Sequence, residues 1–142
     1  MKRWLSAEMS SILLSLAVSA AAFAFFKYIP NYTPGPDQSW IRSMPGWLSL
    51  GYITVQLWML LDSALRVRPT SVIDAVLAIA PVVTGIVCGV LWMVGYLHLS
   101  LFQLNALAML ITTGVVEFVS TLWVRNVVLQ RGVSVLPHTE TQ

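Results

Sequence analysis

Glu117 is the residue whose type and position most strongly suggest chemistry, because it is a carboxylic acid inside a long apolar segment. It lies seven residues before Val124, where that segment ends, which places it about 10 Å below a membrane surface at about 1.5 Å per helical residue. No basic residue lies within one helical turn of it. An acid at the centre of a spanning helix costs about 2.5–3.5 kcal/mol. Its presence indicates either a proton or cation site or a hydrogen bond to another helix.

Three further polar residues accompany Glu117 in the apolar segments. Thr113 and Thr121 lie four residues before and after it, so one helical face carries all three side chains. Gln56 is the most central polar residue of another apolar segment, and its amide can both donate and accept hydrogen bonds. Glu117, Gln56, Thr113 and Thr121 are therefore the candidate intramembrane polar site. Bridging between helices, worth about 0.6–2 kcal/mol per bond, explains the same residues and is the more frequent role.

The other acids in or beside the apolar segments have simpler structural explanations. Glu8 falls in the first turn of a predicted helix, where a carboxylate complements the helix dipole. Asp62 precedes Arg66 by four residues, which is the spacing of an ion pair on one helical face. Ser71 and Asp74 have the spacing of a capping box that opens the following helix. These acids give no indication of a functional site.

No residue pattern typical of catalysis or of a cofactor occurs in the sequence. The two histidines, His98 and His138, fall on opposite sides of the predicted membrane, and Cys88 is the single cysteine. This excludes a Cys/His zinc site and an internal disulfide. A Gly-rich phosphate loop and a nucleophile elbow are also missing. We therefore expect no enzyme activity, no metal and no cofactor. A net charge of +2 without a basic run also argues against nucleic acid as a partner.

The composition of the chain indicates what surrounds these residues. Of the 142 residues, 57% are hydrophobic and 10% are charged, whereas soluble domains carry roughly 25% charged residues. A soluble domain is excluded because so few charges cannot cover its surface. A disordered chain is excluded because it requires low hydrophobicity and high net charge. The composition therefore predicts an integral membrane protein.

Four apolar stretches are long enough to cross a bilayer, which takes about 20 helical residues. They cover residues 6–29, 46–65, 72–97 and 101–124. None alternates between apolar and polar residues, so we expect helices rather than a β-barrel. The first stretch exceeds the roughly 7–15 residues of a signal-peptide core, and we expect it to remain as an anchor. The predicted fold is one all-α membrane domain, residues 1–142, with four transmembrane helices in an antiparallel bundle.

The connections between these helices are predicted to be unequal. Residues 30–45 form the one sizeable external loop, and the spacing of Trp40, Met44 and Trp47 predicts a short turn of helix on the outer membrane surface. A tight turn at residues 98–100 joins the last two helices. Residues 125–142 are predicted to form a polar cytoplasmic tail.

The basic residues predict the orientation of the chain. With the N-terminus inside, the outer side holds only Lys27 and Arg42. The cytoplasmic side then holds Lys2, Arg3, Arg66, Arg68, Arg125 and Arg131. This bias predicts that both termini are cytoplasmic. We expect a multi-pass protein of the bacterial inner membrane, whose immediate partner is the lipid bilayer.

Small residues recur at helical spacing and predict faces for close helix packing. Ser11, Ser15 and Ser19 repeat every fourth residue in the first apolar stretch. Gly85 and Gly89 form a GxxxG pattern in the third. Such faces let two backbones approach closely in a membrane. They suit packing within the chain, against another membrane protein, or against a second copy of this chain.

Three functions fit these features. The favoured one is a non-catalytic subunit, or an accessory or assembly component, of a larger membrane complex, since catalytic groups are missing and packing faces are present. The second is a small homo-oligomeric transporter or channel for a proton-coupled or cationic solute, using Glu117 and Gln56. The third is a holin-like pore former. The chain shares only its layout with these classes, and no residue motif assigns it to any of them.

Overall fold

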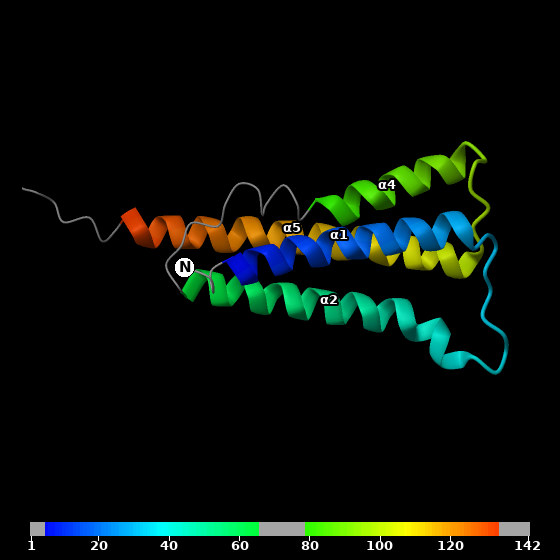
Figure 1. Cartoon of the computed structure of the whole chain (residues 1–142), viewed down its shortest axis with the longest axis horizontal. Helices are drawn as coiled ribbons and strands as arrows, with labels where there is room; N and C mark the ends of the chain where they lie inside the picture. The colour runs from blue at the N-terminus through cyan, green and yellow to red at the C-terminus, as the bar shows by residue number, and fades with distance from the viewer. Residues whose placement is uncertain (1–4, 66–78, 134–142) are drawn as a thin grey trace, which may run out of the picture.

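The computed structural model describes residues 5–65 and 79–133 of the chain (Figure 1). All regular secondary structure in this part is helical. Its helices in this part are α1 (Leu5–Tyr28), α2 (Ser39–Leu65), α4 (Ala80–Met93) and α5 (Leu101–Val133). Successive helices reverse direction, so that α1 and α4 run one way and α2 and α5 the other (Figure 1). The beginning of α1 and the end of α5 therefore lie at the same end of the molecule.

The packing of the helices is uneven. α5 makes extensive contact with both α2 and α4, and α1 packs mainly on α4, whereas α1 and α2 touch little. The two pairs α2–α5 and α1–α4 consist of helices that run in the same direction. The predicted alternation thus holds for helices that follow one another, but some of the closest neighbours in space are parallel.

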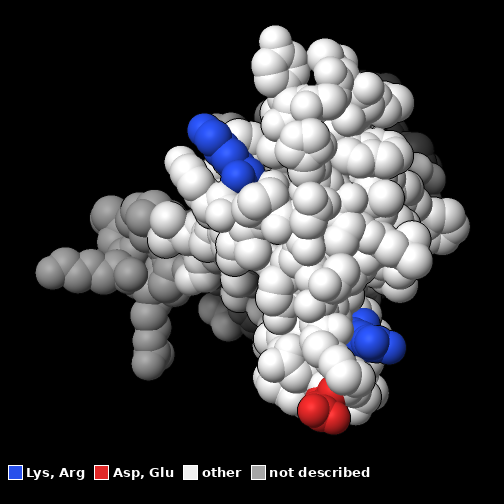
Figure 2. Space-filling view, turned by 90° about the vertical axis from the view of Figure 1, so that its right-hand side faces the viewer, with Lys and Arg blue, Asp and Glu red and all other residues white. Residues whose placement is uncertain are grey.

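Two of the described helices are long and apolar enough to cross a membrane. The apolar segments are Ser10–Tyr28 in α1 and Leu101–Val124 in α5, and α4 is a shorter apolar helix. Large apolar side chains also remain exposed on the outside of the molecule, among them Trp58 and Trp123, which are 75% and 73% exposed. The face in Figure 2 carries only a few charged side chains, scattered among uncharged ones.

Three of the predicted boundaries differ from the structure. α2 begins at Ser39, so residues 39–45 of the predicted external loop are helical, and the spacing of Trp40, Met44 and Trp47 belongs to the first part of this long helix. Pro45 lies inside this helix, where a proline removes one backbone hydrogen bond and bends the axis.

The last helix is longer than predicted and the third ends earlier. α5 continues to Val133, so residues 125–133 of the predicted tail are helical. α4 ends at Met93 rather than at residue 97, and residues 94–100 form the connection that was predicted to be a tight turn at 98–100. Residues 72–78 of the third predicted stretch, together with Ser71 and Asp74, lie outside the described residues.

Gly95 explains the early end of α4. Its φ is +86°, a left-handed conformation that glycine adopts without steric cost. The N–H of Gly95 donates to the carbonyl of Trp92 at 3.0 Å, and the N–H of Tyr96 donates to the carbonyl of Leu91 at 2.9 Å. This is the Schellman arrangement, which satisfies the last carbonyls of a helix and turns the chain away from its axis.

Two glycines allow α4 and α5 to approach closely. A Cβ atom on Gly85 would lie 2.5 Å from Cγ1 of Ile111. A Cβ atom on Gly114 would lie 2.6 Å from Cγ2 of Val82. Gly89, the second glycine of the GxxxG pattern, has ordinary space beside it. The face containing Gly85 is therefore used for packing inside the chain.

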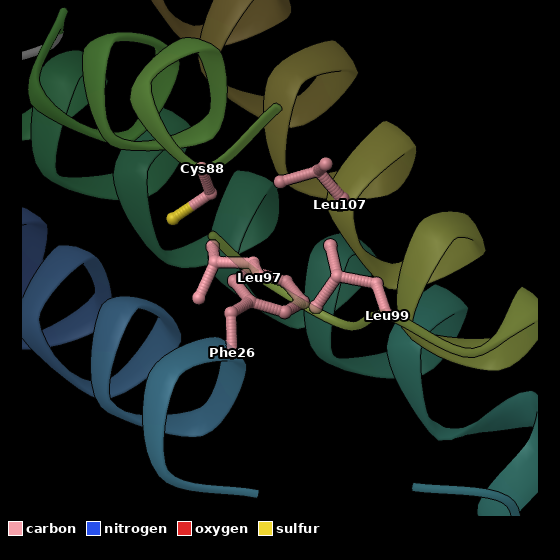
Figure 3. Packing of buried hydrophobic residues seen from close by; sticks show 5 residues of the cluster. All are labelled: Phe26, Cys88, Leu97, Leu99 and Leu107. Atoms are coloured by element: carbon pink, nitrogen blue, oxygen red, sulfur yellow. The ribbon is translucent and has the colours of Figure 1, made fainter. Parts of the chain in front are cut away.

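A small apolar core lies at the end of the molecule where the chain passes from α4 to α5. It contains Phe26 of α1, Cys88 of α4, Leu97 and Leu99 of the connection, and Leu107 of α5 (Figure 3). Cys88 is fully buried and acts there as a small packing residue. The core joins α1, α4 and α5 at this end, while α2 does not contribute to it.

Candidate functional site

Glu117 is buried among the helices and is hydrogen-bonded to two of them. Its side chain is 6% exposed. The hydroxyl of Tyr52 on α2 donates to Oε2 of Glu117 at 2.7 Å, and the hydroxyl of Ser15 on α1 donates to Oε1 at 3.5 Å. Both partners are neutral hydroxyls. The carboxyl group therefore links α5 to α1 and α2.

Gln56 extends this arrangement into a network. Its Nε2 donates to the hydroxyl of Tyr52 at 3.1 Å and to that of Ser15 at 3.4 Å. Its Oε1 accepts from the hydroxyl of Ser11 at 2.7 Å. The hydroxyls of Ser15 and Tyr52 are themselves 2.7 Å apart. We call Ser11, Ser15, Tyr52, Gln56 and Glu117 the Glu117 network.

Helical spacing brings the network together. Ser11 and Ser15 are four residues apart on α1, and Tyr52 and Gln56 are four residues apart on α2. Side chains at this spacing share one face of a helix. The polar faces of α1 and α2 thus both contact α5 at Glu117. Since hydroxyl hydrogens can rotate, the network can accept a carboxylate or, with the Tyr52 bond reversed, a protonated acid.

The structure places the four predicted site residues in different situations. Glu117 and Gln56 both lie in the network and are connected through Tyr52 and Ser15. Thr121 donates to the backbone carbonyl of Glu117 at 2.9 Å, a bond within its own helix. Thr113 is 5% exposed, and its hydroxyl has no hydrogen bond within the described part of the chain.

The serines predicted for helix packing have a further role. Ser11 and Ser15 supply hydroxyls to the network, and Ser19 donates to the backbone carbonyl of Ser15 at 2.8 Å. Tyr52, which contacts Ser15, Gln56 and Glu117 in the network, is absent from the predicted site. Its spacing of four residues from Gln56 is the signal that indicates it.

A second buried polar cluster lies where α1 ends and α5 begins. Gln103 is fully buried, and its Nε2 donates to the carbonyl of Ile29 at 2.6 Å. Its Oε1 accepts from the backbone N–H groups of Tyr32 and Ser100, both at 3.0 Å. The hydroxyl of Ser100 accepts from the N–H of Gln103 at 3.2 Å and donates to the carbonyl of Tyr32. We call these four residues the Gln103 clamp.

The Gln103 clamp combines a helix cap with a link between two connections. Ser100 and Gln103 bond each other in the pattern of a capping box, which starts α5. The same glutamine holds the chain that leaves α1, through Ile29 and Tyr32. The spacing Ser100–Leu101–Phe102–Gln103 is the sequence signal of this cap, which the predicted site does not include.

A cavity of about 860 Å³ lies between α1, α2 and α5. Its lining is mostly apolar, and none of the described residues that line it is charged. It extends along α1 from Leu14 to Ile29, and Tyr52 and Thr113 line it as well. The cavity therefore reaches the Glu117 network through Tyr52.

The site has the groups needed to hold helices together and to bind a hydrogen-bonding molecule. Within the described residues, no three side chains among histidine, cysteine, aspartate and glutamate gather as metal ligands do. Comparison with protein families, with curated proteins and with solved structures finds no match for this chain. Its function is therefore inferred from its sequence and its geometry alone.

Proposed function

We propose that this chain is a multi-pass membrane protein with four spans, cytoplasmic termini and a place in the bacterial inner membrane. Two apolar helices of sufficient length support this proposal. Exposed apolar side chains on the described helices also support it, because water would disfavour such a surface and lipid would not. The bias of basic residues toward one side supports the orientation.

Within the membrane, the chain serves as a non-catalytic component of a larger assembly. The observation that carries this proposal is that both oxygens of Glu117 bond to side chains of two other helices. The most unusual polar residue of the apolar body thus has a structural partner on each oxygen. A protein built in this way offers neighbours a fixed helical surface rather than a reactive group.

A proton-coupled or cation transporter is the second candidate, and the cavity favours it. Tyr52 lines the cavity and donates a hydrogen bond to Glu117. A solute in the cavity would therefore be one side chain away from an acid. A change in the protonation of Glu117 would reorient the hydroxyl of Tyr52 and thereby change the lining of the cavity.

Purification in lipid-retaining particles, with the native mass and all co-purifying proteins measured together, tests the two candidates. The assembly proposal predicts a foreign partner at a fixed ratio whose own activity falls when this chain is deleted. It also predicts that Glu117→Gln, which keeps the size of the side chain, leaves that activity unchanged.

A homo-oligomer without a partner, combined with loss of solute uptake in Glu117→Gln vesicles, would overturn the assembly proposal in favour of transport. Asn105→Asp is the matched control, because residue 105 is an exposed position on the same helix. This control should change neither the mass of the complex nor uptake.

A further inference from the structure

We propose that the cavity between α1, α2 and α5 binds a slender, neutral, membrane-soluble molecule with a hydroxyl or carbonyl oxygen at one end. This site is independent of the assembly proposal, because it concerns what one copy of the chain binds. Three observations on the described residues define the occupant: the size of the cavity, the lack of charge among the lining residues, and a buried hydroxyl that has no hydrogen bond to any of them.

The size and lining of the cavity select an apolar molecule. A volume of about 860 Å³ lies within the roughly 300–1,000 Å³ typical of small-molecule sites. The cavity extends from Leu14 of α1 to Ile29, just beyond the end of that helix, a separation of fifteen residue steps that corresponds to about 22 Å at about 1.5 Å per residue. An elongated shape of this kind suits a molecule with a chain. Since no charged residue of the described chain lines it, an ionic group would lose its hydration without compensation from these residues.

Thr113 provides the polar end of the site. It lines the cavity, it is 5% exposed, and its hydroxyl has no hydrogen bond among the described residues. A buried hydroxyl without a partner is unfavourable. A ligand oxygen at this end of the cavity would remove that penalty.

Other threonines of α5 do have a hydrogen bond for their hydroxyl. Thr112 and Thr121 donate to the carbonyls of Ala108 and Glu117, four residues earlier, at 2.9 Å each. This is the usual solution for threonine inside a helix. Thr113 lacks this bond, and among the three it is the one that lines the cavity.

The Tyr52 hydroxyl cannot replace Thr113 as the main contact, because it is already occupied. It donates to Glu117 and accepts from Gln56. Tyr52 therefore lines the cavity without offering a free hydroxyl. The occupant needs only one hydrogen-bonding oxygen, and the rest of its length contacts apolar side chains such as Val18, Ala22 and Ala106.

Photo-crosslinking of the full chain in lipid vesicles tests the site. The probes are a diazirine-bearing dodecan-1-ol and the matched diazirine-bearing dodecane, and mass spectrometry maps the labelled residues. In the wild type, the alcohol should label Val18 and Ala22 saturably and more strongly than the alkane. Thr113→Val keeps the shape of the side chain and removes the hydroxyl. It should lower labelling by the alcohol about two- to tenfold, the worth of one hydrogen bond, and leave labelling by the alkane unchanged.

Two further variants complete the test. Thr112→Val removes a neighbouring hydroxyl that is bonded within its helix and should change neither probe. Ala106→Phe fills the cavity and should remove labelling of Val18 and Ala22 by both probes. The proposal is overturned if the two probes label equally, or if Thr112→Val and Thr113→Val have the same effect. Labelling that spreads evenly over exposed residues such as Leu13 and Val119 would also overturn it.

Discussion

The Gln103 clamp and the Glu117 network are both buried and polar, but they bond to different parts of the chain. Gln103 bonds to backbone groups of Ile29, Tyr32 and Ser100. Glu117 bonds to the side chains of Tyr52 and Ser15. Backbone groups cannot turn away from a partner, whereas hydroxyls and amides can change rotamer. The clamp therefore fixes where two connections meet, and the network fixes how three helices pack while keeping the freedom to rearrange.

The two clusters should therefore differ in how well they tolerate the loss of one side chain. Loss of the Gln103 side chain would remove three hydrogen bonds at once and leave part-buried backbone groups of Ile29, Tyr32 and Ser100 without this partner. Loss of one network member would leave others with alternative bonds, because Ser15, Tyr52 and Gln56 contact one another. We therefore expect the clamp to contribute more to stability, and the network to be the more adaptable of the two.

Gln103→Leu should have the largest effect. It removes the hydrogen bonds to the carbonyl of Ile29 and to the N–H groups of Tyr32 and Ser100, which are part-buried and worth about 1 kcal/mol each. We expect a loss of about 3 kcal/mol or more in the free energy of unfolding, measured by reversible unfolding in mixed micelles. Asn105→Leu, at an exposed position of the same helix, is the control. Equal effects of the two variants would refute the role of the clamp.

Tyr52→Phe should have an intermediate effect. It removes the donor to Glu117 and the acceptor for Gln56 but leaves the bonds of both to Ser15. We expect a loss of about 1–2 kcal/mol in the free energy of unfolding, in the same measurement. Tyr28→Phe, at a position 71% exposed, should change little. A loss as large as that of Gln103→Leu would contradict the adaptability of the network.

Thr113→Val should have a small effect on stability. The hydroxyl has no hydrogen bond among the described residues, so its removal breaks none there. We expect no loss, and a gain of up to about 1 kcal/mol, because valine does not carry the desolvation penalty of a buried unpaired hydroxyl. A loss above about 1 kcal/mol would mean that the hydroxyl is bonded in the folded protein.

The interaction energy between Gln103→Leu and Tyr52→Phe should be the smallest of these effects, because the two clusters share no residue. Effects at independent sites add to within about 0.3–0.5 kcal/mol. The free energy of unfolding of the double variant should therefore equal the sum of the two losses. A larger interaction energy would show that the clamp and the network form one unit.

Much of the helical fold could be predicted from the apolar stretches, because their length and composition dominate local structure. The ends of the helices were less predictable. Gly95 ends α4 through its left-handed backbone, and Ser100 with Gln103 begins α5. Both signals are present in the sequence, but the apolar run through residue 97 conceals the first. α5 continues beyond Val124 because helix formation does not require an apolar sequence, so the end of the apolar run does not mark the end of the helix.

The polar site was predictable only in part. Glu117 and Gln56 stand out because polar residues are rare in apolar segments. Their link through Tyr52 depends on how α1, α2 and α5 pack, which a single sequence does not specify. Thr113 and Thr121 have the same residue type and the same spacing from Glu117. Only packing separates the one that lines a cavity from the one that bonds to its own helix.

The double-mutant cycle of Tyr52→Phe with Glu117→Met tests most directly the claim that Glu117 holds helices together. Methionine keeps the length of the side chain and removes both acceptors. The free energy of unfolding of the wild type, both single variants and the double variant should give a coupling energy of about 0.6–1.7 kcal/mol, the range of hydrogen bonds between membrane helices. A coupling energy of zero within error would show that the bond between Tyr52 and Glu117 contributes nothing to the fold, and would contradict this account.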